Sequence, residues 1–415
     1  MADYPQTRFL DRTTPPHILT LVVLAGLSAL SMNIFLPSLP NMAEYFHTNY
    51  ATMQLSVSLY LGMTGVLQLV IGPLSDRFGR RPVILFGLSL FLLATVGCLL
   101  AQNIETFLLF RMVQTATATG LVLSRAIVRD MVPADQSASL IGYVTMGMAV
   151  VPMAAPALGG YLDQLFGWQA NFSILLVMGA LVLAIVWADL GETNRYKSDS
   201  FMAQLRDYPE LFTSRRFWGY ALTAAFASGS FFAFLGGAPF IATNYFGLSS
   251  SQLGIYFGIV SLGYIGGNYI SGRYSTRLGI NQMVLLGTLI TLTGLILSFI
   301  FLASGVTHPL SFFGFMLTVG IGNGMVLPNS NAGMLSVRPQ LAGSASGLGG
   351  SIMLGGGASL AAFTGAILTP ESGPYPLLVL MIVTSVFAVA TILYVIRVAH
   401  QAGPLGGTDS ADTTT

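Results

Sequence analysis

The chain alternates between long apolar runs and shorter polar gaps. A run of about 20 mostly apolar residues is long enough to cross a bilayer as a helix. Twelve such runs predict an all-α polytopic membrane protein with twelve transmembrane helices. The predicted spans cover residues 17–40, 51–72, 82–101, 106–128, 138–162, 169–189, 217–241, 252–271, 281–304, 309–330, 341–368 and 374–397.

The composition agrees with a membrane protein. Only 8% of the residues are charged and 53% are hydrophobic, whereas about a quarter of the residues of a soluble domain are charged. The formal net charge is +1, so there is no electrostatic basis for binding nucleic acid. A single cysteine, Cys98, excludes an internal disulfide.

Lys and Arg residues collect in alternate gaps between the apolar runs. Cytoplasmic loops accumulate Lys and Arg while translocated loops do not, so this alternation predicts that both termini are cytoplasmic. Residues 1–16 carry charges and a Pro-Pro break, and we do not expect them to be a cleaved signal peptide. The pattern comprises Arg8, Arg12, Arg77, Arg80, Arg81, Arg125, Arg129, Arg195, Lys197, Arg206, Arg215, Arg216, Arg273, Arg277, Arg338 and Arg397.

The longest polar stretch separates six predicted spans from six others. This organisation is typical of transporters with two pseudo-equivalent halves. Sequence similarity between the halves is faint: Arg273 and Arg277 echo the basic turn after the second span, without its acid. We expect a cytoplasmic N-terminal segment 1–16, six-helix bundles 17–190 and 217–398, a cytoplasmic linker 191–216 and a disordered cytoplasmic tail 399–415.

The turn after the second span is the most specific motif. It reads Gly72-Pro73-Leu74-Ser75-Asp76-Arg77-Phe78-Gly79-Arg80-Arg81-Pro82. Gly72 and Gly79 permit a tight hairpin, and Asp76 among three arginines can form charge-assisted hydrogen bonds. A solvated cytoplasmic loop explains the basic residues, but not the spacing of the whole string.

This string resembles the loop signature of the major facilitator superfamily. Further strings are similar to its drug exporters, and some to the bicyclomycin/chloramphenicol-resistance (Bcr/CflA) branch. They are Leu109 to Gln114 in the fourth span, Gly142 and Pro152 with Pro156 to Gly160 in the fifth (a partial match to the antiporter signature), Phe35 to Pro40, and Ser124 to Asp130.

The resemblance implies a fold, a mechanism and a location. It implies a monomeric twelve-helix bundle of two six-helix halves in the bacterial inner membrane. This transporter would export small drugs or metabolites in exchange for protons by rocker-switch alternating access. Gly72, Asp76, Arg77, Gly79, Arg80 and Arg81 would form a charge relay, or conformational latch, that stabilises the outward-facing state.

Two polar residues lie at membrane depth in the first half. Arg111 is the one basic residue inside an apolar run, and such residues are costly and usually functional. Asn33 lies at similar depth in the first span, so the two could form the polar core of a substrate site. The alternatives are an arginine that packs against backbone carbonyls and an amide that is satisfied between helices.

Asn33 departs from related exporters, which commonly carry an acid before the Phe-Leu-Pro string. An amide cannot titrate, so the usual proton carrier is in doubt. Coupling could use Asp163 or the Asp76 turn, or transport could be uncoupled.

Other aromatic and amide groups on the expected cavity helices are candidates for substrate contact, and the alternative for each is simple packing. They are Gln54, Tyr60, Gln114, Phe231, Phe232, Phe234, Tyr264, Asn268, Asn323, Asn329 and Asn331. In the fifth span, prolines and glycines favour a bend and close helix packing; they are Gly142, Pro152, Pro156, Gly159 and Gly160.

Other functional classes find little support. Glycine-rich strings lack the Lys-Ser/Thr of a phosphate-binding loop, and the four histidines are scattered. We expect no enzymatic activity, metal or cofactor; the expected partners are a small-molecule substrate, protons and the lipid bilayer. A metabolite facilitator or importer, and a membrane receptor derived from a transporter fold, are the alternatives.

Overall fold

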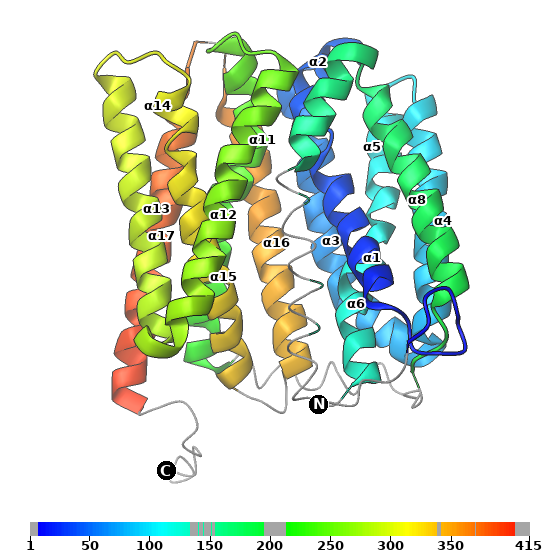
Figure 1. Ribbon diagram of the computed structural model, residues 1–415. Helices are drawn as coiled ribbons and strands as arrows, with labels where there is room; N and C mark the ends of the chain where they lie inside the picture. The colour runs from blue at the N-terminus through cyan, green and yellow to red at the C-terminus, as the bar shows by residue number, and fades with distance from the viewer. Residues whose placement is uncertain are drawn as a thin grey trace.

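The computed structural model describes residues 7–132, 140, 144, 151, 154–194, 213–337, 342–369 and 371–402. Within these residues every regular element is a helix. Figure 1 shows two bundles standing side by side, the first made of α1 to α8 and the second of α11 to α17.

The first bundle holds α1 (Ile18–Asn33), η1 (Leu36–Ser38), α2 (Leu39–Tyr45), α3 (Tyr50–Phe78), α4 (Arg80–Leu100), α5 (Ile104–Val113), η2 (Gln114–Thr117), α6 (Ala118–Met131), a helical stretch 154–166 and α8 (Gln169–Asp189). The second holds α11 (Arg215–Asn244), α12 (Ser250–Leu278), α13 (Ile280–Ala303), α14 (Leu310–Phe313), α15 (Met316–Val337), α16 (Ala342–Ile367) and α17 (Tyr375–Ala402).

The helical spans predicted from the apolar runs are confirmed. Eleven helices in the described part of the chain are long and apolar enough to cross a membrane. The fifth predicted span, 138–162, lies largely outside the described residues. Several helices begin at a polar N-cap in the gap before them: the side chains of Asn49, Asn103 and Ser249 accept hydrogen bonds from backbone N–H groups of the first turn.

Two turns, 200 positions apart, reveal the internal repeat. α3 and α12 continue past their apolar runs and end at Gly79 (φ 101°) and Gly279 (φ 83°). Each glycine N–H donates to the carbonyl of a serine four residues earlier, over 2.9 Å. This φ is open to glycine and strained for other residues. The hairpin is therefore shorter than expected, and Gly72 lies inside α3 rather than in the turn.

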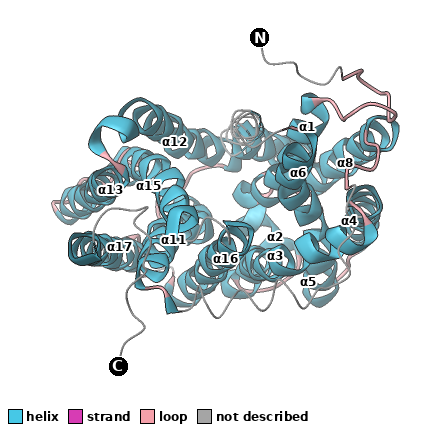
Figure 2. Ribbon diagram, turned by 90° about the horizontal axis from the view of Figure 1, so that it is seen from below, coloured by secondary structure: helices cyan, strands magenta, loops and turns pink. Residues whose placement is uncertain are grey.

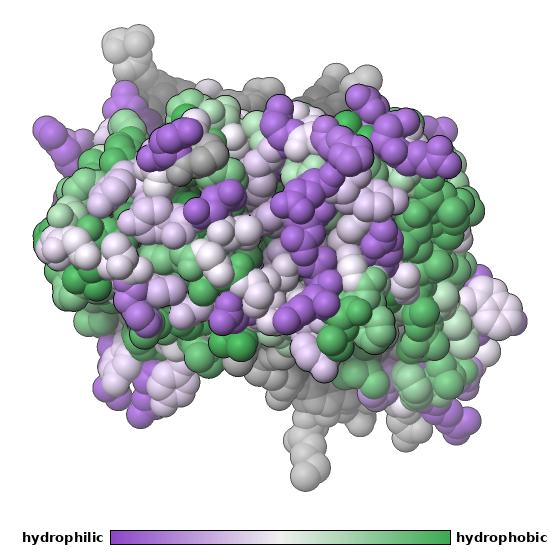
Figure 3. Space-filling model, turned by 90° about the horizontal axis from the view of Figure 1, so that it is seen from above, coloured by the Kyte–Doolittle hydropathy of each residue, from purple (hydrophilic) through white to green (hydrophobic). Residues whose placement is uncertain are grey.

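The two bundles meet at one end of the molecule, which we call the α2 end; the opposite end, with the two glycine turns, is the Gly79 end. At the α2 end the Asn41 amide donates to the Ser250 hydroxyl over 3.4 Å, and the Tyr50 hydroxyl donates to the Gly236 carbonyl over 2.7 Å. Figure 3 shows this end, with hydrophilic residues spread over the face and hydrophobic residues on its flanks.

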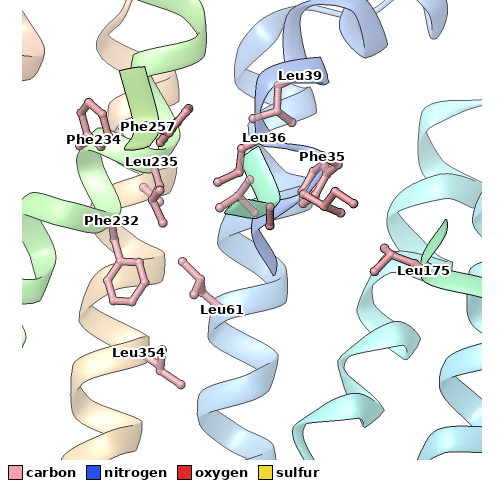
Figure 4. Packing of buried hydrophobic residues seen from close by; sticks show 14 of the residues in the cluster. Phe35, Leu36, Leu39, Leu61, Leu175, Phe232, Phe234, Leu235, Phe257 and Leu354 are labelled. Carbon is pink, nitrogen blue, oxygen red and sulfur yellow. The ribbon is translucent and has the colours of Figure 1, made fainter. Parts of the chain in front are cut away.

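Below the α2 end, α3 lies alongside α16 (Figure 2). The Ser351 hydroxyl donates to the Gly65 carbonyl over 2.8 Å. In Figure 4, Leu61 of α3 points toward Phe232 of α11 and Leu354 of α16. Apolar contacts between the bundles therefore extend from the α2 end toward the middle of the molecule. Cys98 lies away from this interface, fully buried within the first bundle.

Candidate substrate cavity

A cavity of about 290 Å³ lies between the bundles, near mid-height. Among the described residues, seven helices contribute to its wall: α1, α3 and α6 from the first bundle, and α11, α12, α15 and α16 from the second. The described lining residues are Ser28, Ala29, Met32, Asn33, Tyr60, Leu61, Thr64, Ala118, Leu121, Arg125, Ser228, Phe231, Phe232, Val260, Ser261, Tyr264, Gly320, Asn323, Leu327, Met353 and Leu354.

Six of the sequence candidates line this cavity: Asn33, Tyr60, Phe231, Phe232, Tyr264 and Asn323. The two amides are held by their own helices. Asn33 donates to the Ala29 carbonyl over 2.7 Å, and Asn323 donates to the Val319 carbonyl over 3.0 Å. The Asn323 carbonyl oxygen is buried and has no hydrogen-bond partner among the described residues.

Arg111 does not reach the cavity, which corrects the hypothesis that it forms a polar core with Asn33. Its side chain is 1% exposed. The guanidinium donates to the Ser31 carbonyl over 2.8 Å, to the Ser56 carbonyl over 3.3 Å and to the Gln114 side chain. It also lies 4.0 Å from the ring centre of Tyr60. Arg111 therefore joins α1, α3 and α5 behind the cavity wall, and it supports Tyr60 from the rear.

Six other candidates also lie off the wall. Asn331 is exposed on α15, and the other five are occupied by packing or hydrogen bonds. Gln114 bonds Arg111 and the Thr95 hydroxyl, Gln54 is buried between α3 and α16, Phe234 belongs to an aromatic cluster with Phe257, Phe312 and Phe313, Asn268 bonds the Tyr264 carbonyl, and Asn329 bonds the Ser271 hydroxyl over 2.7 Å.

Arg125 is the main lining residue that the sequence did not single out. The charge pattern assigned it to the cytoplasmic end of the fourth span, but α6 continues to Met131 and keeps Arg125 within the helix. Its side chain is partly exposed and lines the cavity. The sequence could have indicated this position. Helical side chains lean toward the N-terminus of their helix, so the Arg125 side chain leans away from the Gly79 end and toward the cavity.

The fifth span approaches both bundles through its small residues. A Cβ at Gly159 would overlap the Ile34 carbonyl of the first bundle, and a Cβ at Gly160 would overlap the Ser250 carbonyl of the second. Pro156 lies against Gly254 of α12. These contacts place the described end of the fifth span at the bundle interface. Gly142 and Pro152 lie outside the described residues.

An acid lies at the same contact. Asp163 is 5% exposed, and its carboxylate accepts a hydrogen bond from the Asn41 amide over 2.6 Å. The same amide donates to Ser250 of the second bundle. Asp163 is thus part of the surface that closes the α2 end.

The basic turn forms a charge cluster at the Gly79 end. Arg80 pairs with Asp76 over 2.6 Å and with Asp130 of α6 over 3.0 Å. The Glu192 carboxylate, beyond α8, accepts hydrogen bonds from the backbone N–H groups of Arg80 and Arg81. Arg77 lies outside this cluster, over the ring of Phe78. The cluster joins α3, α4, α6 and the segment after α8 within one bundle.

Comparison with known proteins gives the family. The Major Facilitator Superfamily model matches residues 21–362. An uncharacterized MFS-type transporter of Bacillus subtilis (strain 168), YdgK, is 33% identical over 381 residues, which cover 88% of this chain and 91% of YdgK. The bicyclomycin resistance protein homolog of Haemophilus influenzae is 27% identical over 370 residues, covering 88% and 92% of the two chains.

A solved structure shows the same fold. A bacterial homolog of the human lysosomal transporter Spinster, in an inward-facing and occupied conformation, matches with a TM-score of 0.68 at 18% identity, over 92% of this chain and 96% of that one. The drug-resistance relative confirms the resemblance to the Bcr/CflA branch. This chain is therefore a multi-pass membrane transporter that belongs to the major facilitator superfamily.

Proposed function

We propose that this transporter exports small, moderately apolar compounds by alternating access, with the cavity between the bundles as the substrate site. The observation that carries the proposal is a cavity lined by both bundles whose α2 end is closed by direct contacts between them. An apolar wall with a few placed polar groups suits such a ligand. Each bundle supplies part of the wall, so a relative movement of the bundles would separate the residues that form the site.

The charge distribution supports an orientation. Lys and Arg fall in the gaps at the Gly79 end, which we assign to the cytoplasm together with both termini. The molecule would then be closed toward the outside and poised to receive substrate from the cytoplasm of a bacterium, across its inner membrane. The family resemblance implies a monomer as the functional unit.

The charge cluster at the Gly79 end is the proposed latch. Arg80 connects carboxylates of α3 and α6, so a shift of either helix changes its ion pairs. This supports the relay implied by the family resemblance. In the present state the cluster is confined to the first bundle among the described residues.

Proton antiport is the coupling that the resemblance implies, and the carrier would have to lie off the cavity wall. Asp163 is a candidate because opening of the α2 end would expose its carboxylate. Asp189 is a poor candidate, since it is fully buried and fixed by the backbone N–H groups of Leu10 and His17 and by the Thr20 hydroxyl. A second candidate function, uncoupled transport, is favoured by a described cavity wall without any Asp or Glu.

A susceptibility and accumulation assay tests export. An efflux-deficient host expressing the chain should tolerate at least one apolar drug better than the vector control and should accumulate less of it. Increased accumulation would indicate an importer, and binding without movement would indicate a receptor. For the exported drug, substrate-dependent proton flux in proteoliposomes separates antiport from uncoupled transport, with protein-free liposomes as the control.

A further inference from the structure

The search for further function leads to the one charged side chain on the cavity wall. Among the described lining residues only Arg125 carries a charge. We propose that the cavity selects amphipathic monoanions, whose charged group binds Arg125 while the apolar body lies against the aromatic wall. This inference rests on the proposed export through the same cavity.

The direction of the side chain supports the assignment. α6 runs from η2 toward the Gly79 end, where Asp130 pairs with Arg80. Helical side chains lean toward the N-terminus of their helix, so Arg125 leans back toward mid-height instead of toward the water beyond Met131. Tyr264, on the second bundle, lines the same cavity as Arg125. Arg125 therefore faces the space between the bundles.

The chemistry of the wall favours an anion over a cation. A guanidinium in a poorly solvated space interacts strongly with a negative group and can bind a carboxylate or sulfonate through two parallel hydrogen bonds. Away from Arg125 the wall is formed largely by apolar side chains such as Met32, Leu61, Phe231 and Phe232. A cationic ligand would meet an unfavourable charge and would find no carboxylate on the described wall.

A charged substrate also changes what the transporter needs in order to pump. An inside-negative membrane potential of 100 mV favours an external over an internal monoanion by about fiftyfold at equilibrium. Electrogenic export of an anion through this cavity therefore requires no proton carrier. The absence of a titratable group at Asn33 is then compatible with extrusion driven by the membrane potential.

The test uses two probes of nearly equal shape, naphthalene-2-sulfonate and the neutral naphthalene-2-sulfonamide. Binding of each is measured by equilibrium dialysis with the full chain in nanodiscs. We expect the sulfonate to bind about ten- to a hundredfold more tightly, as charge-assisted hydrogen bonds imply. Arg125→Gln should reduce this preference to about threefold or less, because it should weaken sulfonate binding far more than sulfonamide binding. Arg125→Lys should keep part of the preference.

Arg273→Gln is the matched control, because Arg273 is exposed on α12 and does not line the cavity. It should leave the preference intact. In proteoliposomes preloaded with the sulfonate, an inside-negative potassium-diffusion potential should accelerate its release without a change in internal pH.

Equal affinity of the wild type for the two probes would overturn the anion site, and so would an Arg125→Gln variant that weakens both probes equally. Export of a drug without any binding of the sulfonate would refute this inference and leave the proposed function standing. Sulfonate binding that depends on Arg125, together with no export of any compound, would refute the proposed function and leave the anion site standing.

Discussion

Arg111 and Arg125 lie on one stretch of chain, but their guanidinium groups meet different surroundings. Near the α2 end, α1 and α3 cover the helix face that carries Arg111, and their carbonyls take up its hydrogen bonds. Farther along, the bundles diverge and leave Arg125 facing a cavity. The position of each residue within its apolar run predicted a functional role for Arg111 and a solvent-exposed cytoplasmic position for Arg125. The contrast shows that surrounding helices, which hydropathy does not report, decide the role of a membrane arginine.

We expect Arg111→Lys to lower the free energy of unfolding by about 2–4 kcal/mol, because an ammonium cannot replace the fork of donors and leaves buried carbonyls without partners. Thermal unfolding and folded yield in detergent, measured by fluorescence-detected size-exclusion chromatography, provide the test. Arg125→Lys is the matched control and should unfold like the wild type. A fully stable Arg111→Lys protein that had lost transport would show that the residue acts on substrate after all.

At the scale of elements, the fifth span presents neighbouring glycines to different partners. Gly159 lies against α1 of its own bundle, and Gly160 lies against the start of α12 in the other bundle. The antiporter signature predicted close packing for both, without distinguishing them. Packing within a bundle maintains the fold, whereas packing between bundles depends on the conformational state.

The pair makes a direct comparison possible. Gly159→Ala should reduce folded yield, since its methyl group would overlap the Ile34 carbonyl inside the bundle. Gly160→Ala should fold normally but close poorly at the α2 end; overpacking of about 1–3 kcal/mol shifts that equilibrium by about 5- to 150-fold. Expression level and initial transport rate are measured side by side. Equal loss of yield in both variants would argue against this division of roles.

The apolar runs predicted the positions of the helices to within a few residues, but they did not predict several helix ends. α8 was predicted at 169–189 and lies at Gln169–Asp189, because its apolar run stops where the helix stops. α3 and α12 extend into polar sequence, since backbone hydrogen bonding continues until Gly79 and Gly279 end it. The breaks at η1 and η2 were also missed, because short 3₁₀ turns barely alter hydropathy.

At the scale of the whole molecule, the repeat is symmetric in backbone and asymmetric in charge. Gly79 and Gly279 end equivalent helices, but Asp76 in the first turn corresponds to Thr276 in the second. The all-helical fold and its superfamily could be predicted from apolar runs and one motif. The conformational state could not be predicted from the sequence. It depends on small differences in free energy between alternative packings of surfaces that lie far apart in sequence.

This asymmetry provides a test of the latch. Asp76→Asn removes the carboxylate that pairs with Arg80 over 2.6 Å and should lower turnover by about two- to fivefold, in keeping with a partly exposed ion pair. Folded yield should not change. Thr276→Asn places the same residue in the equivalent turn and serves as the control. Wild-type turnover in Asp76→Asn, measured as the transport rate at saturating substrate, would remove the latch assignment.

The burial of Cys98 makes the native chain suitable for thiol spectroscopy. Its sulfur has no contact with solvent and lies 4.0 Å from the Phe107 carbonyl oxygen, and the sequence has no second cysteine. Water-borne maleimide or nitroxide reagents should therefore label only cysteines introduced on purpose. Spin labels on cysteines introduced at Asn41 and Ser250 could then measure the separation of the bundles without replacement of Cys98.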